Sequence, residues 1–201
     1  EFKEKLIRDI FTFLEQFKEI EQIFIFGSFL TREIDYNDID ILIMGSKEDV
    51  EDKFYKPLIR KFNLKFHIIS IKRDKLKEIL KICPLTRSML YYSVSNKKII
   101  DLPKKEVDEK HLRFLLMLPQ DLLEVDVNSK MFYDALRRLL TIELFLQDKE
   151  IDPKKIDEKL TSHLEKPLLE RIKDNKPLID KDTKKIRSLI KDKLLKIEKL
   201  L

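Results

Sequence analysis

The sequence predicts an α/β (α+β) protein in two parts, a small mixed-sheet domain over residues 1–103 followed by an all-helical bundle domain over residues 104–201. Two observations carry this prediction. Short β-branched and aromatic runs occur in the first hundred residues, separated by segments of helical periodicity. After Pro103 no convincing strand pattern follows, and apolar residues recur at helical spacing instead.

Helical spacing of apolar residues predicts the helices of the first part. They are expected over 2–18, over 29–35 as one or two turns, from about 46 into the fifties, and over 74–82. Ser46 with Asp49 fits the capped start of the third of these helices. Pro57 is expected to kink that helix or to start a new segment.

Apolar runs bounded by turn residues predict the strands. Three buried strands are expected at Ile23–Phe26, Asp38–Met44 and Leu64–Ile71. A further pair, Ser88–Val94 and Lys97–Asp101, is expected to form a hairpin around Ser95-Asn96. Because side chains alternate along a strand, Asp38 and Asp40 are expected on one face of the second strand.

The second part is predicted to be a helical bundle. Asn128 or Ser129 is expected to cap a helix over 130–147, whose apolar residues surround most of its circumference and therefore place it at the centre. Asp152-Pro153 predicts another helix start. A last helix is expected from about residue 182, with one apolar stripe.

Composition narrows the functional class. Hydrophobic residues make up 43% of the 201, so the chain is not a disordered one. Charged residues reach 39%, an excess that resembles the proteins of hyperthermophiles. The net charge of +5 is modest, which argues against a large nucleic-acid footprint. A single cysteine, Cys83, and the lack of a membrane-spanning apolar run favour a cytoplasmic protein without a membrane partner.

The stretch Ile23–Met44 holds the residues with the clearest chemical meaning. The chain has only two glycines, and one of them, Gly27, is followed by Ser28 at the end of a predicted strand. A glycine and a hydroxyl residue at such a turn let backbone N–H groups approach phosphate oxygens. Asp38 and Asp40 on one strand face suit a hard divalent cation such as Mg²⁺. These residues together predict a site for a metal-bound triphosphate.

This pattern resembles the signature of the DNA polymerase β nucleotidyltransferase superfamily, and in particular its minimal and kanamycin nucleotidyltransferase-like members. The resemblance rests on the apolar strand, Gly27-Ser28, and Asp38-Ile39-Asp40 with its apolar tail. The segment Pro84–Tyr92 also resembles the end of that domain.

The resemblance implies transfer of a nucleotidyl group from a nucleoside triphosphate, with ATP expected, to a hydroxyl acceptor on a protein, an RNA or a small molecule, with release of pyrophosphate. It implies Mg²⁺ or Mn²⁺ held by Asp38 and Asp40, and phosphate contacts from Gly27, Ser28 and Arg32. A separate-chain protein partner and a homodimer are options that it leaves open.

Two departures from the family pattern qualify this prediction. Arg32 comes later after the Gly-Ser pair than the family's basic residue. His67 stands where the family has a third catalytic carboxylate, and it can accept Mn²⁺ or act as a general base. The base can also come from the helical part, where Glu124, Asp126 and Glu143 are alternatives.

A second hypothesis is a catalytically impaired member of the same fold, which binds a nucleotide or a partner without turnover, for example as the antitoxin-like partner of a helical toxin. His67 motivates it. Other interpretations stay open: an Asp-x-Asp pair can mark an ordinary strand end, Ser28 can be a turn residue, and His67 can be a half-buried structural residue. Gly45 is expected only to end a strand.

Overall fold

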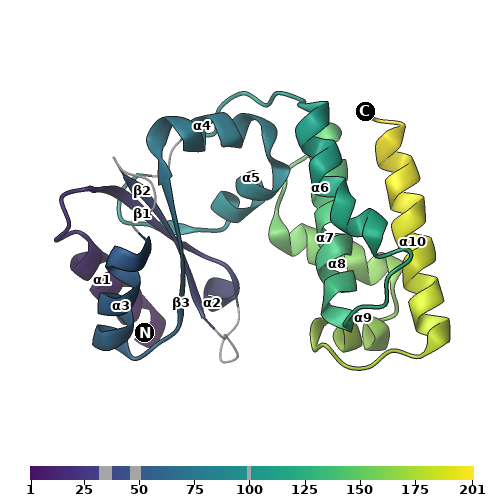
Figure 1. Cartoon of the computed structure of the whole chain (residues 1–201), viewed down its shortest axis with the longest axis horizontal. Coiled ribbons are helices and arrows are strands. Elements are labelled where there is room, and N and C mark those ends of the chain that lie inside the picture. The colour runs from purple at the N-terminus through teal and green to yellow at the C-terminus, as the bar shows by residue number, and fades with distance from the viewer. Residues whose placement is uncertain (32–37, 46–50, 99–100) are drawn as a thin grey trace. The chain divides into compact units, whose positions relative to one another are not determined.

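The computed structural model describes residues 1–31, 38–45, 51–98 and 101–201, and divides into two compact units (Figure 1). The first unit contains Glu1–Lys81 and Met89–Lys104, and the second contains Ile82–Ser88 and Lys105–Leu201. The division falls inside helix α5 (Pro84–Tyr91), so the chain leaves the first unit, returns to it and leaves it again.

The first unit is built on a mixed sheet with the strand order β3-β2-β1-β4. The strands are β1 (Ile20–Phe26), β2 (Ile39–Gly45), β3 (Phe66–Lys72) and β4 (Val94–Ser95). Strand β1 pairs antiparallel with β2 and β4, whereas β2 and β3 run parallel. Strands β1 and β2 are buried over most of their length, as expected for runs so rich in Ile and Phe.

Helices cover both faces of this sheet (Figure 1). On one face, α1 (Phe2–Leu14), α2 (Ser28–Thr31) and α3 (Glu51–Phe62) pack their apolar side chains against those of the strands. On the other face, Leu76 and Leu80 of α4 (Arg73–Ile82) pack against side chains of β1 and β2. The alternation of the strands divides the two cores, because Leu42 and Met44 face α4 while Ile41 and Ile43 face α1 and α3.

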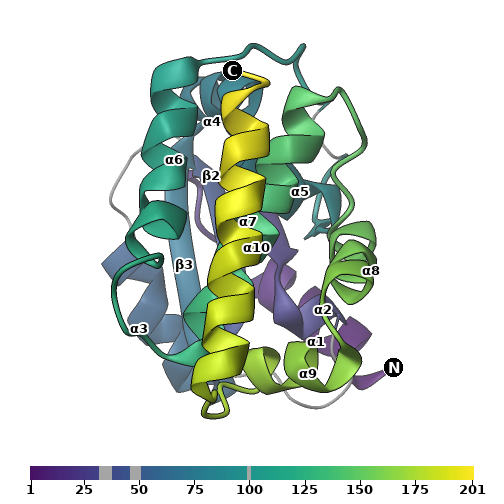
Figure 2. The same ribbon diagram turned by 90° about the vertical axis from the view of Figure 1, so that its right-hand side faces the viewer.

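The second unit is a helical bundle around α7 (Ser129–Leu146). The other helices are α6 (Glu109–Asp121), α8 (Pro153–His163), α9 (Lys166–Lys173) and α10 (Asp180–Glu198), and each of them packs against α7. Figure 2 shows α10 running along α6 and α7. The side chains of Asn128 and Asp152 cap α7 and α8 by accepting hydrogen bonds from Met131 N and Lys154 N.

The fold class is as the sequence predicts, a small mixed sheet with helices followed by helices alone. The central position of α7 is also confirmed, since twelve of its residues are buried. Among the described residues, no helix is long and apolar enough to cross a membrane.

Several sequence-based predictions were wrong in detail. The predicted strand at Ser88–Val94 is helix α5 as far as Tyr91, because Pro84 favours a helix start and Leu90 packs beside α4. No hairpin turn forms at Ser95-Asn96; β4 pairs instead with β1, which precedes it by about seventy residues. Neither Lys97 nor Lys98 is in a strand.

Helix boundaries also differ from those expected. Helix α1 ends at Leu14, four residues earlier than predicted, and α3 continues through Pro57 without starting a new segment. The predicted cap at Ser46 and Asp49, the residues 32–35 of the expected short helix and the side chain of Arg32 lie outside the described residues.

Candidate active site

The strand register brings three predicted site residues together. Asp40 is the partner of Phe26 across the antiparallel β1–β2 pair and of His67 across the parallel β2–β3 pair. Gly27 follows Phe26 directly, so the end of β1 and the starts of β2 and β3 meet at one edge of the sheet. Asp38 precedes β2 by one residue and is half-buried.

Position 27 requires a glycine for two reasons, its backbone conformation and the close approach of the Asp40 carboxylate. Its φ of 82° lies in the left-handed region, which side chains disfavour. A Cβ at this position would lie 2.1 Å from Asp40 Oδ2. The carboxylate therefore rests against the glycine backbone, at a distance that no other residue type allows.

The same carboxylate contacts His67 with its other oxygen. His67 Nδ1 lies 3.1 Å from Asp40 Oδ1, and the exposed fractions of the two side chains are 61% and 21%. Burial raises the pKa of the Asp40 carboxyl, the hydrogen bond with His67 opposes this shift, and the negative charge of Asp38 adds to it. An ionised Asp40 in this place is poorly stabilised by its neighbours, and a bound cation would relieve that cost.

Ser28 begins α2, a single turn that follows Gly27. Two contacts hold this turn in place. The side chain of Phe29 is fully buried, and Lys3 Nζ donates a hydrogen bond of 2.8 Å to the carbonyl oxygen of Phe29. Leu30 N donates to Gly27 O. Nothing in the sequence indicates a role for Lys3, because it lies 26 residues before Phe29. Only the packing of α1 against this turn brings the two residues together.

The residues present fit a hard divalent cation. The carboxylates of Asp38 and Asp40 are oxygen donors of the kind that Mg²⁺ and Mn²⁺ accept. Within the described part of the chain, no group of three or more His, Cys, Asp or Glu side chains is arranged to hold a metal ion by itself. Mg²⁺ sites that use one or two carboxylates and take the remaining ligands from phosphate and water have this character.

Two of the three alternative bases in the helical unit, Glu143 and Asp126, form ion pairs with basic side chains. Glu143 is buried between Lys193 and Lys196, at 3.0 Å and 2.5 Å. Burial would raise the pKa of Glu143, but hydrogen bonds from Lys196 and Lys193 outweigh it and hold that pKa below its usual value. A carboxylate held in this way is a weak base. The sequence could not reveal it, because the lysines lie about fifty residues further on.

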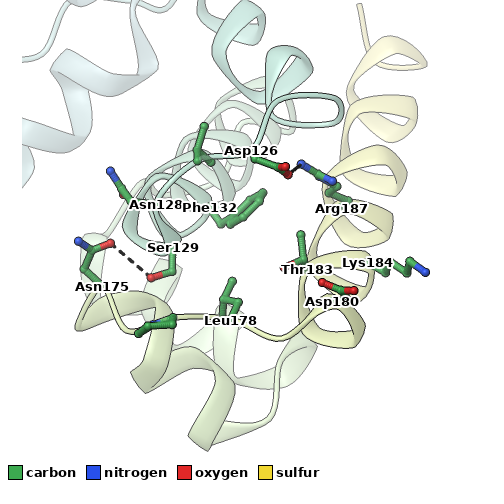
Figure 3. A pocket seen from close by; sticks show the side chains of 12 residues that line it. Asp126, Asn128, Ser129, Phe132, Asn175, Leu178, Asp180, Thr183, Lys184 and Arg187 are labelled. Atoms are coloured by element: carbon green, nitrogen blue, oxygen red, sulfur yellow. Dashed lines mark hydrogen bonds and ion pairs between the residues drawn. The ribbon is translucent and has the colours of Figure 1, made fainter.

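Asp126 also has a basic partner. It forms an ion pair with Arg187 at 3.0 Å on the rim of a pocket of about 520 Å³ in the helical unit (Figure 3). Arg187 also donates to the carbonyl oxygens of Leu122 and Val125, so it links the segment between α6 and α7 to α10. Glu124 is exposed.

Comparisons with known proteins find a match to a family model and a protein of similar fold. Residues 8–100 match the family model described as polymerase beta, nucleotidyltransferase. The spectinomycin adenyltransferase of Enterococcus faecialis, solved with ATP and spectinomycin, has a similar fold, with a TM-score of 0.55 and 11% sequence identity over 96% of this chain and 98% of that one. A search of curated proteins finds no match. The resemblance inferred from the sequence is confirmed.

Proposed function

We propose, on the premise that residues 8–100 form a nucleotidyltransferase domain of the polymerase β family, that the chain is a metal-dependent nucleotidyltransferase. It moves a nucleotidyl group from a nucleoside triphosphate, with ATP as the expected donor, to a hydroxyl acceptor and releases pyrophosphate. The similar adenyltransferase, solved with ATP and spectinomycin, supports a nucleotide donor and a small-molecule acceptor as the first to try.

The observation that carries this proposal is the contact between Gly27 and Asp40. A turn with positive φ touches the carboxylate of Asp40, with Ser28 next in the chain and Asp38 two residues before Asp40. A phosphate-accepting turn and a cation-binding carboxylate are thereby within reach of one triphosphate.

The chemistry requires few protein groups. The acceptor oxygen bonds to the α-phosphorus, the bond from that phosphorus to the oxygen bridging to the β-phosphorus breaks, pyrophosphate leaves and the hydroxyl proton passes to a base. Asp38 and Asp40 would hold Mg²⁺ or Mn²⁺, which neutralises charge on the phosphate oxygens. Gly27 and Ser28 would position the triphosphate, with Arg32 as a further phosphate contact proposed from the sequence alone.

His67 is the third polar group of the site by virtue of its contact with Asp40. A neutral imidazole in this place can either take the hydroxyl proton or bind the metal.

Transfer of label tests the function. The full chain is incubated with α-labelled ATP, Mg²⁺ or Mn²⁺, and a panel of aminoglycoside, nucleic-acid and protein acceptors. We expect label transfer that is lost in Asp38→Ala and in Asp40→Ala and retained in Asp9→Asn, which alters an exposed carboxylate on α1. Transfer that persists in both site variants would refute the assignment.

A second function is favoured by His67 alone: a member of the fold that binds a nucleotide or a partner chain without turnover. It predicts binding of labelled ATP without transfer to any acceptor, and transfer restored by His67→Asp. Turnover by the unaltered chain rules it out. Co-purification with a helical partner chain would support the antitoxin-like form of this alternative.

We further propose a cytoplasmic location, supported by a single buried cysteine, Cys83, and an origin in a thermophile, supported by the excess of charged residues. A homodimer remains a proposal that light scattering of the purified chain would test.

A further inference from the structure

We propose that His67 is a direct ligand of the metal at this site, so that the site selects a divalent transition ion, Mn²⁺ among them, over Mg²⁺. The site is that of the proposed function, but metal binding is measured without nucleotide or acceptor, so the two proposals can fail separately.

The distance between Asp40 and His67 fits a shared metal. Two ligands in neighbouring positions of an octahedral metal, each at about 2.1 Å, lie about 3.0 Å apart. His67 Nδ1 and Asp40 Oδ1 are separated by 3.1 Å. A cation can therefore replace the hydrogen bond between these two atoms with little movement of either side chain.

The backbone holds both ligands in place. Asp40 and His67 are register partners on parallel strands, and side chains of register partners project from the same face of a sheet. Gly27 limits the rotation of the Asp40 carboxylate, because Oδ2 lies against its Cα. Oδ1 is thereby directed toward the imidazole rather than toward the turn.

Among the described residues, no group of three or more His, Cys, Asp or Glu side chains is arranged to hold a metal ion, so the proposed site rests on two protein ligands. An Asp40–His67 pair, with Asp38 two residues before Asp40 in the chain, leaves the other metal positions to phosphate and water. The imidazole is exposed over 61% of its side chain, so the metal and its remaining ligands have room to approach.

Nitrogen in the ligand set changes the preferred metal. Mg²⁺ binds oxygen ligands and gains little from imidazole, whereas first-row transition ions accept it readily. An imidazole ligand from His67 therefore favours Mn²⁺ over Mg²⁺. If Nδ1 binds the metal, the ring carries its hydrogen on Nε2, and His67 is then not the base of the reaction.

Electron paramagnetic resonance of the full chain titrated with Mn²⁺ alone tests this proposal. We expect one bound Mn²⁺ whose spin-echo modulation shows a directly coordinated ¹⁴N. His67→Ala should abolish that modulation and reduce Mn²⁺ affinity by about tenfold or more. His67→Asp should abolish the modulation as well, but raise Mg²⁺ affinity measured by competition.

His163→Ala is the matched control, because it removes an exposed histidine of the helical unit, at the end of α8. It should leave both the modulation and the affinity unchanged. Circular dichroism confirms that each variant is folded.

Three outcomes would overturn the proposal: no bound Mn²⁺ in the unaltered chain, bound Mn²⁺ without ¹⁴N coupling, or equal Mn²⁺ affinity in the unaltered chain and His67→Ala. ¹⁴N coupling without label transfer would support the metal ligand and contradict the enzyme. Label transfer with Mg²⁺ in a chain that lacks ¹⁴N coupling would do the reverse.

Discussion

Gly27 and Gly45 are the only glycines of the chain, and they provide a matched pair of substitutions. Gly27→Ala forces a side chain into a left-handed backbone and against Asp40. We expect it to lower the free energy of unfolding by about 1–3 kcal/mol and to abolish Mn²⁺ binding, because the carboxylate must move. Chemical denaturation and Mn²⁺ titration measure the two effects.

Gly45→Ala serves as the control, since its Cβ would lie 2.5 Å from the carbonyl oxygen of Glu19, away from the carboxylates. Gly45 does more than end a strand, as it pairs within β2 where no side chain fits. We expect this variant to be destabilised and still to bind Mn²⁺. Equal Mn²⁺ affinity in Gly27→Ala and the unaltered chain would contradict the role given to Gly27.

Asp40 should make the metal-free protein less stable at neutral pH. Its folded pKa is raised above the ordinary value of 3.8, so the folded state binds the proton more tightly than the unfolded chain does. The ionised group therefore costs stability once the pH rises above 3.8, and the full cost is present above the folded pKa. We expect Asp40→Asn to unfold at a higher temperature than the unaltered chain at pH 7.

This gain in unfolding temperature should shrink as the pH falls toward 3.8, because Asp40 then becomes protonated in both the folded and the unfolded state. Thermal unfolding without metal, followed from pH 7 to pH 4, measures the trend. A gain that is constant with pH, or a lower unfolding temperature of Asp40→Asn at pH 7, would show that ionisation of Asp40 does not destabilise the folded state.

At the scale of an element, the contact between α7 and α10 includes one buried carboxylate, that of Glu143. Glu143 and Lys193 have side chains that are 9% and 10% exposed, and they pair at 3.0 Å. Removing one partner of such a pair leaves the other buried and unpaired. We expect Glu143→Ala to lower the free energy of unfolding by about 3–5 kcal/mol at pH 7, as measured by urea denaturation.

Lys196→Ala is the control for this experiment. The side chain of Lys196 is half-exposed, so this variant should lower the free energy of unfolding by less than about 1 kcal/mol.

The effect of Glu143→Ala should also depend on pH. The pKa of Glu143 in the folded state is lowered from 4.5, so the ionised carboxylate stabilises the fold above pH 4.5, and this stabilisation is lost as the pH falls through the lower folded pKa. The difference between Glu143→Ala and the unaltered chain should therefore narrow in acid; a difference that does not depend on pH would contradict the ion pair.

At the scale of the whole molecule, the division into two compact units, each with buried apolar residues of its own, predicts two unfolding components in calorimetry. Gly45→Ala should lower the midpoint of one component and Glu143→Ala that of the other, by about 4–8 °C for each kcal/mol lost. A single transition that both variants shift equally would contradict this independence.

Local patterns were sufficient wherever neighbours in the chain decide the structure. The helix caps at Asn128 and Asp152, the buried strands and the amphipathic helices follow from residues within one or two turns. Gly27-Ser28 and the aspartate pair could be recognised for the same reason, since their spacing is a property of the chain itself. The family resemblance and the fold class could therefore be predicted from the sequence.

Tertiary structure decided whatever depends on pairing over long distances. The segment before Val94 is helical because Leu90 packs beside α4, although its composition suits a strand. The contact of His67 with Asp40 needs the β2–β3 register, and the ion pairs of Glu143 need α10. The sequence by itself determined which residues could form a phosphate and metal site; the packing of distant segments determined which of them touch, because contact energies depend on neighbours that the local sequence does not specify.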